Sequence, residues 1–595
     1  MQNIVLLSST AFIFRFLPVF LIVYWIAPKK LRNAVIYFGS IVFYAAGSPI
    51  FVLLLILLTL LNYMLGVFSW QFGRAKLPEE GADPDPRNHS EGETDQEENG
   101  HLLPKAGFDE EAGQHHEPES MLEADNEDWL IDIADKIELQ TKNISGETDA
   151  AEKAAPARSS YIEQRSGKWR FRSSADPKSN TSAGRSALSE GPAAHSAAPS
   201  AASASAASAA SKTPAAPVKG EMGFVWAVAL DIAVLIVFKV VALKWNAELF
   251  PLGLSFYIFK MISYQADLTM GKLEKQPSFM QTAAYFTLFT QITQGPIMRF
   301  GDGSFAEPAK FSLDKLEEGL VYVVLGLGMK TLLADRIAIL WNEIGKIGYE
   351  SISTGLAWLG AYSYTFELYF DFWGYSLIAA GVTVMMGFPF IENFRHPYAA
   401  VGIGDFYRRW HATLGSWFRD YIYIPLGGSR EGNLKTVRNL MVVWVLTGLW
   451  HGGTLNFLIW GVILGIMIVL EKYPLKPVLK HVPLFGRLET WVLIPLSWVI
   501  FAISDLPQLW LYFTRLFPML SGTPVGQEMS DLIRLGSLYW PYFAAALVLC
   551  VPGVFKWILK NRRHPLIVLA LTALFWVSVY YSANMSGNTF MYLNF

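Results

Sequence analysis

The chain has 595 residues, of which 52% are hydrophobic and 14% aromatic. A soluble chain of this length would form several domains, but here apolar runs of roughly 17–25 residues recur, the length of a helix that crosses a bilayer. The formal net charge of -3 averages two unlike parts, because residues 75–220 carry 27 acidic and 15 basic side chains and the rest carries 24 acidic and 33 basic. The composition therefore excludes a simple soluble domain and predicts a basic membrane domain interrupted by an acidic insert.

Three apolar runs precede the insert, at 8–27, 33–47 and 50–70. Lys29, Lys30 and Arg32 follow the first of them. Since Lys and Arg concentrate in short cytoplasmic loops, the first helix is predicted to run from outside to inside. The first run lacks a basic n-region and a small-residue cleavage site, so we expect a membrane helix there and not a removed signal peptide. Residues 1–74 are therefore predicted to be N-terminal membrane helices, the last of which ends at the cytoplasmic face.

The insert, residues 75–220, is acidic in its first part and rich in Ala, Ser and Pro in its second. Neither part has enough large apolar residues to form a core, so a disordered cytoplasmic segment is predicted. A stretch from Trp129 to Leu139 has helical spacing, which fits either a docking helix or a transient helix in a solvated linker. The histidines of the insert are scattered and do not indicate a metal site.

Residues 221–595 are predicted to form the rest of the membrane core. The segment Phe250–Gly271 is too polar for a lipid-facing helix, and the chain beyond it is broken at Gly295-Pro296, as is tolerated where protein or a water-filled cavity surrounds the break. Glu367 and Asp371 share one helix face, so they either line a polar route or pair with an arginine of a neighbouring helix. Further apolar spans are expected near 222–243, 315–345, 354–387, 456–471, 488–505, 537–557 and 565–582.

His451 lies in an apolar run between Trp450 and Gly452-Gly453. An ionisable ring in such a run is costly unless it has partners or a task, which makes it a candidate functional residue. The ring fits two roles: a hydrogen-bonded packing group between helices, or a neutral general base, whose neutral form burial favours. The residue pattern leaves both roles open.

A second histidine, His411, lies in a segment dense in arginine and aromatic residues. Positive charge in this density indicates the cytoplasmic face, and that topology alone explains most of the arginines. The alternative is that a few of them bind a phosphorylated cytosolic donor, because a guanidinium group binds phosphate through two hydrogen bonds.

The sequence RRWHATLGSWFRDYIYIPLGGSR, followed by LTGLWHGGTLNFLIWG, resembles the membrane-bound O-acyltransferase family, in particular the bacterial branch that includes alginate O-acetylase and the D-alanyl transferase of teichoic acids. The pieces LGLSFYIFKMISYQAD, QITQGPIMRF, LYFDFWGYS, GFPFIENFRHPY and FMYLNF also match. The resemblance covers residues 1–70 and 222–595, and does not extend to the insert.

The resemblance implies an all-α polytopic membrane protein, a bundle of about 11–13 helices around a transmembrane tunnel. It implies that an acetyl or other acyl group from cytoplasmic acetyl-CoA is moved towards a hydroxyl of an extracytoplasmic polysaccharide such as alginate, or of a cell-wall polymer. A separate extracytoplasmic acetyltransferase partner is expected, in a bacterial inner membrane. No bound cofactor, metal ion or nucleic acid is expected.

The family's near-invariant histidine corresponds to His451, and its second active-site residue to His411. Acyl transfer from a thioester needs a base for the acceptor hydroxyl and donors for the developing oxyanion. We expect His451 to be that base. We expect His411 or Tyr421 to position the substrate or to stabilise the developing charge. The further candidates for substrate or donor binding are Arg408, Arg409, Trp410, Arg419, Asp420, Tyr421, Trp450 and Asn456.

Two other classes of function remain open from the residues alone. A transporter or flippase would also use a polar tunnel and a helix broken at Gly295-Pro296, although such proteins commonly carry internal repeats and none is visible here. A catalytically silent scaffold of a polysaccharide export system is the other alternative.

Deletion of residues 80–215 is expected to leave membrane insertion and thioester turnover intact, because the insert lies outside the family pattern. The measurement compares the deleted and full-length chains in detergent by size exclusion and by release of CoA from acetyl-CoA. Loss of folded protein on deletion would contradict this expectation.

Overall fold

The computed structural model describes residues 7–73, 162–165, 168–171, 219–303, 305–520 and 529–584. The chain divides into two units, one made of residues 1–85 and 217–595 and the other of residues 86–216. In the second unit, β1 (Ile162–Arg165) and β2 (Lys168–Phe171) form an antiparallel hairpin that the sequence analysis did not predict. The rest of the insert, with its predicted disorder and the helical stretch predicted at 129–139, lies outside the described residues, as does the terminal FMYLNF.

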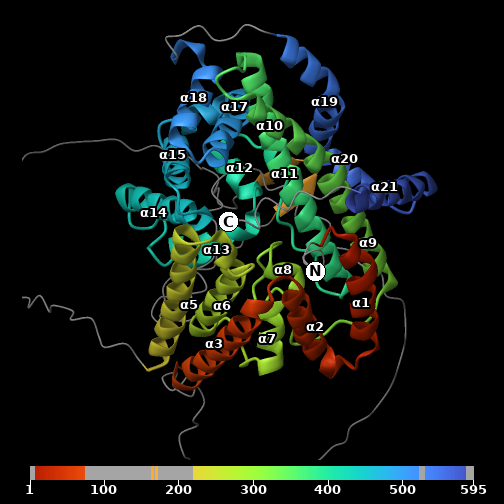
Figure 1. Cartoon of the computed structure of the whole chain (residues 1–595). Coiled ribbons are helices and arrows are strands. Elements are labelled where there is room, and N and C mark those ends of the chain that lie inside the picture. The colour runs from red at the N-terminus through yellow and green to blue at the C-terminus, as the bar shows by residue number, and fades with distance from the viewer. Residues whose placement is uncertain are drawn as a thin grey trace, which may run out of the picture. The chain divides into compact units, whose positions relative to one another are not determined.

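The described residues of the first unit form helices and connecting turns, which confirms the all-α prediction (Figure 1). The helices are α1 (Leu17–Ile26), α2 (Arg32–Gly47), α3 (Val52–Gly73), α5 (Lys219–Lys244), α6 (Leu254–Thr269), α7 (Phe279–Thr287), α8 (Phe289–Ile292), α9 (Leu313–Gly328), α10 (Asp335–Ile347), α11 (Thr354–Met385), α12 (Ile403–Arg409), α13 (Ala412–Phe418), α14 (Asn433–His451), α15 (Leu455–Lys472), α16 (Lys476–His481), α17 (Pro483–Ala502), α18 (Leu506–Leu516), α19 (Ser530–Cys550), α20 (Pro552–Lys560) and α21 (Pro565–Asn584).

Among the described residues, seven helices are long and apolar enough to cross a membrane: α3, α5, α11, α15, α17, α19 and α21. The segment Phe12–Ile26 is a shorter apolar helix. Along α5, α19 and α21 few side chains of the apolar stretch are buried, as expected of helices that face lipid. The chain is therefore a multi-pass membrane protein. The span predicted at 537–557 is wrong in one respect, because the helix ends at Cys550 and a new helix begins at Pro552.

Helix α11 forms the centre of the unit. It has 32 residues, so at 1.5 Å per residue it is roughly 48 Å long, more than the hydrocarbon core of a bilayer. Its apolar stretch is completely buried, in contrast to the lipid-facing helices. It contacts α9, α10, α17, α18 and α19, and we conclude that it is the scaffold on which the surrounding helices pack.

Helices α9 and α11 approach closely through two pairs of glycines. A Cβ added at Gly326 would lie 2.4 Å from the carbonyl oxygen of Gly374, and one added at Gly374 would lie 2.7 Å from that of Gly326. Gly319 and Gly381 face each other in the same way, at 2.4 and 2.5 Å. Small residues allow this backbone contact, which is the usual means of close helix packing within membranes.

Asp371 of α11 has an ion-pair partner, but it is not the arginine considered in the sequence analysis. Lys330 lies in the π-helical turn between α9 and α10, and its Nζ is 2.8 Å from Asp371 and 2.5 Å from Asp335. Lys330 and Asp371 are both buried. Glu367 lies one helical turn before Asp371 and is buried as well. A buried charge needs a partner of opposite charge, and the lysine supplies it.

Gly326→Ala is expected to lower the stability of the protein in detergent by about 1–3 kcal/mol, because the added methyl group meets backbone and not a flexible side chain. The measurement is the thermal unfolding midpoint of the purified protein. Gly536→Ala in α19 is the matched control, since an added Cβ there has no neighbour within 4 Å. If both variants unfold at the parent temperature, the close contact of α9 with α11 is wrong.

Candidate functional site

His411 occupies the turn between the short helices α12 and α13, which lie near the middle of Figure 1. Its φ of 44° is in the left-handed region, where non-glycine residues are uncommon and tend to occur at functional sites. The entry to this turn is fixed by Glu471 of α15, which accepts hydrogen bonds from the backbone N–H groups of Ile403 and Gly404 at the start of α12. The carbonyl of Arg409, at its end, accepts a hydrogen bond from Arg395 N at 3.0 Å.

The imidazole of His411 is buried, and its Nδ1 lies 2.9 Å from Oδ1 of Asn393. The edge of the ring meets Phe372 of α11, with 4.7 Å between ring centroids. Burial lowers the pKa of the His411 imidazole to about 3, so the ring is neutral near neutral pH. Within the described part of the chain, Nε2 is buried and has no hydrogen-bond partner.

His451 is the last residue of α14 and is buried in an aromatic cage. Its ring centroid lies 4.6 Å from that of Trp450, 5.2 Å from Trp460 and 5.1 Å from Phe501. Glycines beside a buried ring allow another segment to approach it closely. At Gly452 it is another segment that approaches, because an added Cβ would lie 2.3 Å from the ring of Phe457.

The two histidines, which lie 40 positions apart in the sequence, are close enough to interact electrostatically, and Lys239 of α5 interacts with His451 in the same way. Nζ of Lys239 donates a hydrogen bond of 2.5 Å to the carbonyl oxygen of Trp450. Lys239 is not among the site residues predicted from the sequence. The signal for it was present, because a lysine inside an apolar run is a candidate functional residue by default.

The arginines predicted to bind donor phosphates have carboxylate neighbours on their own segment. Arg408 and Arg409 both contact Asp405, at 3.2 and 3.0 Å, and Arg419 contacts Asp420 at 2.7 Å. All three guanidinium groups are partly exposed. Pairs of this kind contribute little stability, so the arginines remain able to exchange a carboxylate for a phosphate.

Tyr421 lies at the centre of a second group of charges. Its hydroxyl donates to Asp267 of α6 at 2.9 Å, and Lys272 and Arg299 each lie 5.3 Å from its ring centroid. Arg299 also contacts Asp420 at 3.3 Å. The structure thus brings Asp420 and Tyr421 together with two cations that the sequence analysis did not include.

Trp410 and Asn456 have packing and hydrogen-bonding roles in the structure. The Trp410 ring stacks on Phe406 with 5.6 Å between centroids. The side-chain amide of Asn456 donates to the carbonyl oxygens of Ile500 and Phe501, both at 3.1 Å, and so holds the end of α17 beside His451. These contacts support the aromatic cage and do not by themselves indicate substrate contact.

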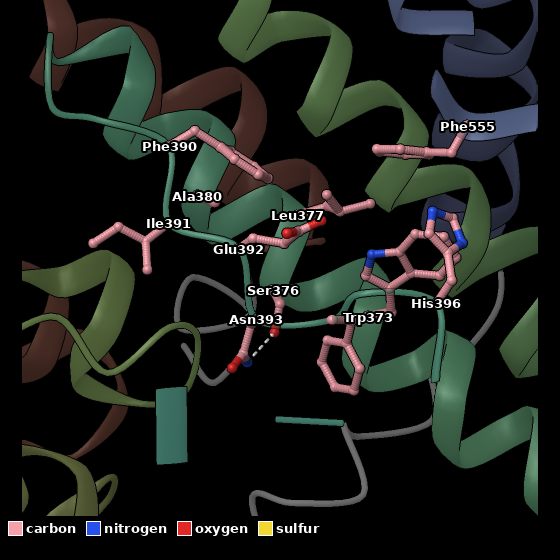
Figure 2. A pocket seen from close by; sticks show the side chains of 11 residues that line it. Trp373, Ser376, Leu377, Ala380, Phe390, Ile391, Glu392, Asn393, His396 and Phe555 are labelled. Atoms are coloured by element: carbon pink, nitrogen blue, oxygen red, sulfur yellow. Dashed lines mark hydrogen bonds between the residues drawn. The ribbon is translucent and has the colours of Figure 1, made fainter. Parts of the chain in front are cut away.

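Asn393 is the main site residue that the sequence analysis missed, although it lies within the quoted stretch GFPFIENFRHPY. Figure 2 shows its side-chain amide joined to Ser376 of α11 at the edge of a small hollow, which Trp373, His396 and Phe555 also line. No group of three or more His, Cys, Asp or Glu side chains that could hold a metal ion occurs among the described residues.

A model of the membrane-bound O-acyltransferase family matches residues 231–502, which include both histidines, Asn393 and Lys239. The chain is 37% identical over 315 residues to the probable alginate O-acetylase AlgI of Pseudomonas aeruginosa, covering 50% of this chain and 58% of that protein. It is 30% identical over 291 residues to the peptidoglycan O-acetyltransferase of Helicobacter pylori (43% and 54%), and 29% identical over 223 residues to the teichoic acid D-alanyltransferase of Bacillus subtilis (35% and 56%). The chain spans about half the length of the curated relatives it matches.

Asn456→Ala is expected to destabilise the protein, because two buried carbonyl groups lose their donor at a cost of about 1–3 kcal/mol each. The thermal unfolding midpoint in detergent measures the effect. Asn584→Ala is the matched control, since its amide makes the same kind of bond to a backbone carbonyl but is exposed. Equal midpoints for the two variants would contradict the role given to Asn456.

Proposed function

Because the chain belongs to the membrane-bound O-acyltransferase family, we propose that it moves an acetyl or other acyl group from cytoplasmic acyl-CoA to a hydroxyl of an extracytoplasmic polysaccharide or cell-wall polymer. The relatives support this class of acceptor, since their names specify alginate, peptidoglycan and teichoic acid. We propose that residues 221–595 form the membrane-embedded catalytic core, that residues 1–74 form N-terminal membrane helices, and that the insert 75–220 lies on the cytoplasmic side of a bacterial inner membrane.

The observation that carries the proposal is the pair of buried imidazoles, His411 and His451, placed within reach of each other's charge. In the proposed reaction the hydroxyl oxygen of the acceptor bonds to the thioester carbonyl carbon and its proton passes to His451, the general base. The carbon–sulfur bond then breaks and releases the CoA thiolate, which takes up a proton. A thiolate leaves readily, so no enzyme nucleophile is required.

The aromatic cage of Trp450, Trp460 and Phe501 excludes water around His451. Exclusion of water protects a thioester from hydrolysis and strengthens every electrostatic interaction with the reacting carbonyl. The cage accordingly favours transfer to a polymer hydroxyl over transfer to water. We propose that Trp450 and Asn456 belong to the site through this cage.

The donor is proposed to bind at the arginine-rich segment between α12 and the turn after α13. Arg408, Arg409 and Arg419 are partly exposed and supply guanidinium groups for the phosphates of CoA. Asp420 and Tyr421 hold the neighbouring cations in place. A separate extracytoplasmic acetyltransferase is the proposed partner that completes delivery to the polymer.

His451→Ala is expected to reduce release of CoA from labelled acetyl-CoA by about 100- to 10,000-fold, the usual contribution of a general base. The assay uses purified full-length protein in detergent, supplied with an oligosaccharide acceptor and the extracytoplasmic partner. His481→Ala is the control, because His481 is exposed and bonded only to the carbonyl of Pro477.

A His451→Ala variant that turns over the thioester as fast as the parent would refute the assigned base. Absence of turnover in the parent, even with partner and acceptor present, would instead favour a transporter or a non-catalytic scaffold.

A further inference from the structure

Oδ1 of Asn393 faces three groups of the turn that follows α12. It accepts hydrogen bonds from Thr413 Oγ1 at 2.8 Å and from the backbone N–H of Thr413 at 3.4 Å, and it lies 2.9 Å from His411 Nδ1. A backbone N–H can only donate, so the side-chain atom that it meets is the amide oxygen. The imidazole nitrogen that faces this oxygen must therefore carry a proton.

The amide cannot easily turn over, because its other end is held as well. Nδ2 of Asn393 donates to Ser376 Oγ of α11 at 3.0 Å, the bond drawn in Figure 2. The backbone carbonyl of Asn393 accepts a hydrogen bond of 2.9 Å from Ala412 N, directly after His411. The side chain is buried, so no solvent competes for these bonds.

Thr413 extends the network to the segment that follows α8. Its Oγ1 accepts a hydrogen bond of 2.9 Å from the backbone N–H of Ile297, beside the Gly295-Pro296 break. With one lone pair of the hydroxyl used in this way, its hydrogen points towards Asn393. The break that the sequence analysis noted in the chain thus helps to orient the histidine.

We infer that Asn393 is a positioning residue that fixes His411 in the tautomer with Nδ1 protonated, so that Nε2 presents a lone pair to a substrate O–H group. This inference rests on the proposed function for the identity of that group, which is the hydroxyl of the acceptor. Nε2 is buried and has no hydrogen-bond partner in the described ranges, as a position kept for a ligand would be.

The tautomer changes the role available to His411. In the neutral ring Nε2 can accept a hydrogen bond but cannot donate one, so His411 does not stabilise the oxyanion as the sequence analysis allowed. It orients the acceptor hydroxyl, whose proton then passes to His451. Because the two rings interact electrostatically, a proton on one disfavours a proton on the other.

Two substitutions of Asn393 test the inference. Asn393→Ala removes the acceptor for Nδ1–H and is expected to lower kcat by about 10- to 100-fold with little change in KM for acetyl-CoA, as loss of an orienting partner does. Asn393→Asp keeps an acceptor at the same place and is expected to restore turnover at high pH. Its carboxylate also stabilises the protonated ring, so the acidic limb of the kcat/KM profile is expected to move to higher pH.

Asn33→Ala is the matched control, because Asn33 is a buried amide that donates to the carbonyl of Phe305, away from both histidines. Size exclusion and thermal unfolding establish that each variant is folded. A folded Asn393→Ala variant with parent kcat would overturn the inference, as would an Asn393→Asp variant whose acidic limb stays at the parent pH.

The tautomer can also be measured without any turnover, by nitrogen NMR of protein labelled in the histidine rings, with His411→Gln to assign the signal. Protonation at Nδ1 in the parent, lost in Asn393→Ala, supports the inference even if the parent proves not to turn over acetyl-CoA. Protonation at Nε2 in the parent overturns it, whatever the activity, so failure of the inference and failure of the proposed function are distinguished.

Discussion

A polar group buried among apolar helices must find its hydrogen-bond partner inside the protein, because lipid offers none. This constraint accounts for the arrangement around both histidines. The amide of Asn393 is hydrogen-bonded at both its oxygen and its nitrogen. The amide of Asn456 donates hydrogen bonds to two carbonyl oxygens at the end of α17. The constraint is left unmet at Nε2 of His411, and we propose that this exception marks the place for substrate.

The packing of the bundle and the chemistry of the site are connected through α11. Glycines let α9 contact its backbone, and the Lys330–Asp371 ion pair joins it to the turn before α10. The same helix carries Phe372, directly after Asp371, and further on Ser376, which contact His411 and Asn393. A rigid, fully buried helix is a suitable support for groups that must stay in place through a reaction.

Much of the fold could be predicted from sequence, because membrane helices are set by the length of apolar runs and the two histidines by a compact motif. The contacts that give these residues their roles could not. His411 and Asn393 are 18 positions apart with a helix between them, and neither periodicity nor spacing shows that their side chains meet. The partner of Asp371 could be expected to be a cation, but its identity as Lys330 depends on a π-helical turn that no sequence pattern indicated. Nor does the sequence indicate which glycines of α9 face which glycines of α11, because that depends on how the two helices pack.

The central claim is that His411 and His451 both act on the acceptor hydroxyl that attacks the thioester carbonyl. The most direct test is a structure of the full-length protein with a stable acetyl-CoA analogue in which a methylene group separates the carbonyl from sulfur. The account predicts that the ketone of the analogue lies against both imidazoles, with the CoA phosphates at the arginine-rich segment between α12 and the turn after α13. An analogue bound with its carbonyl away from these two rings would contradict the account.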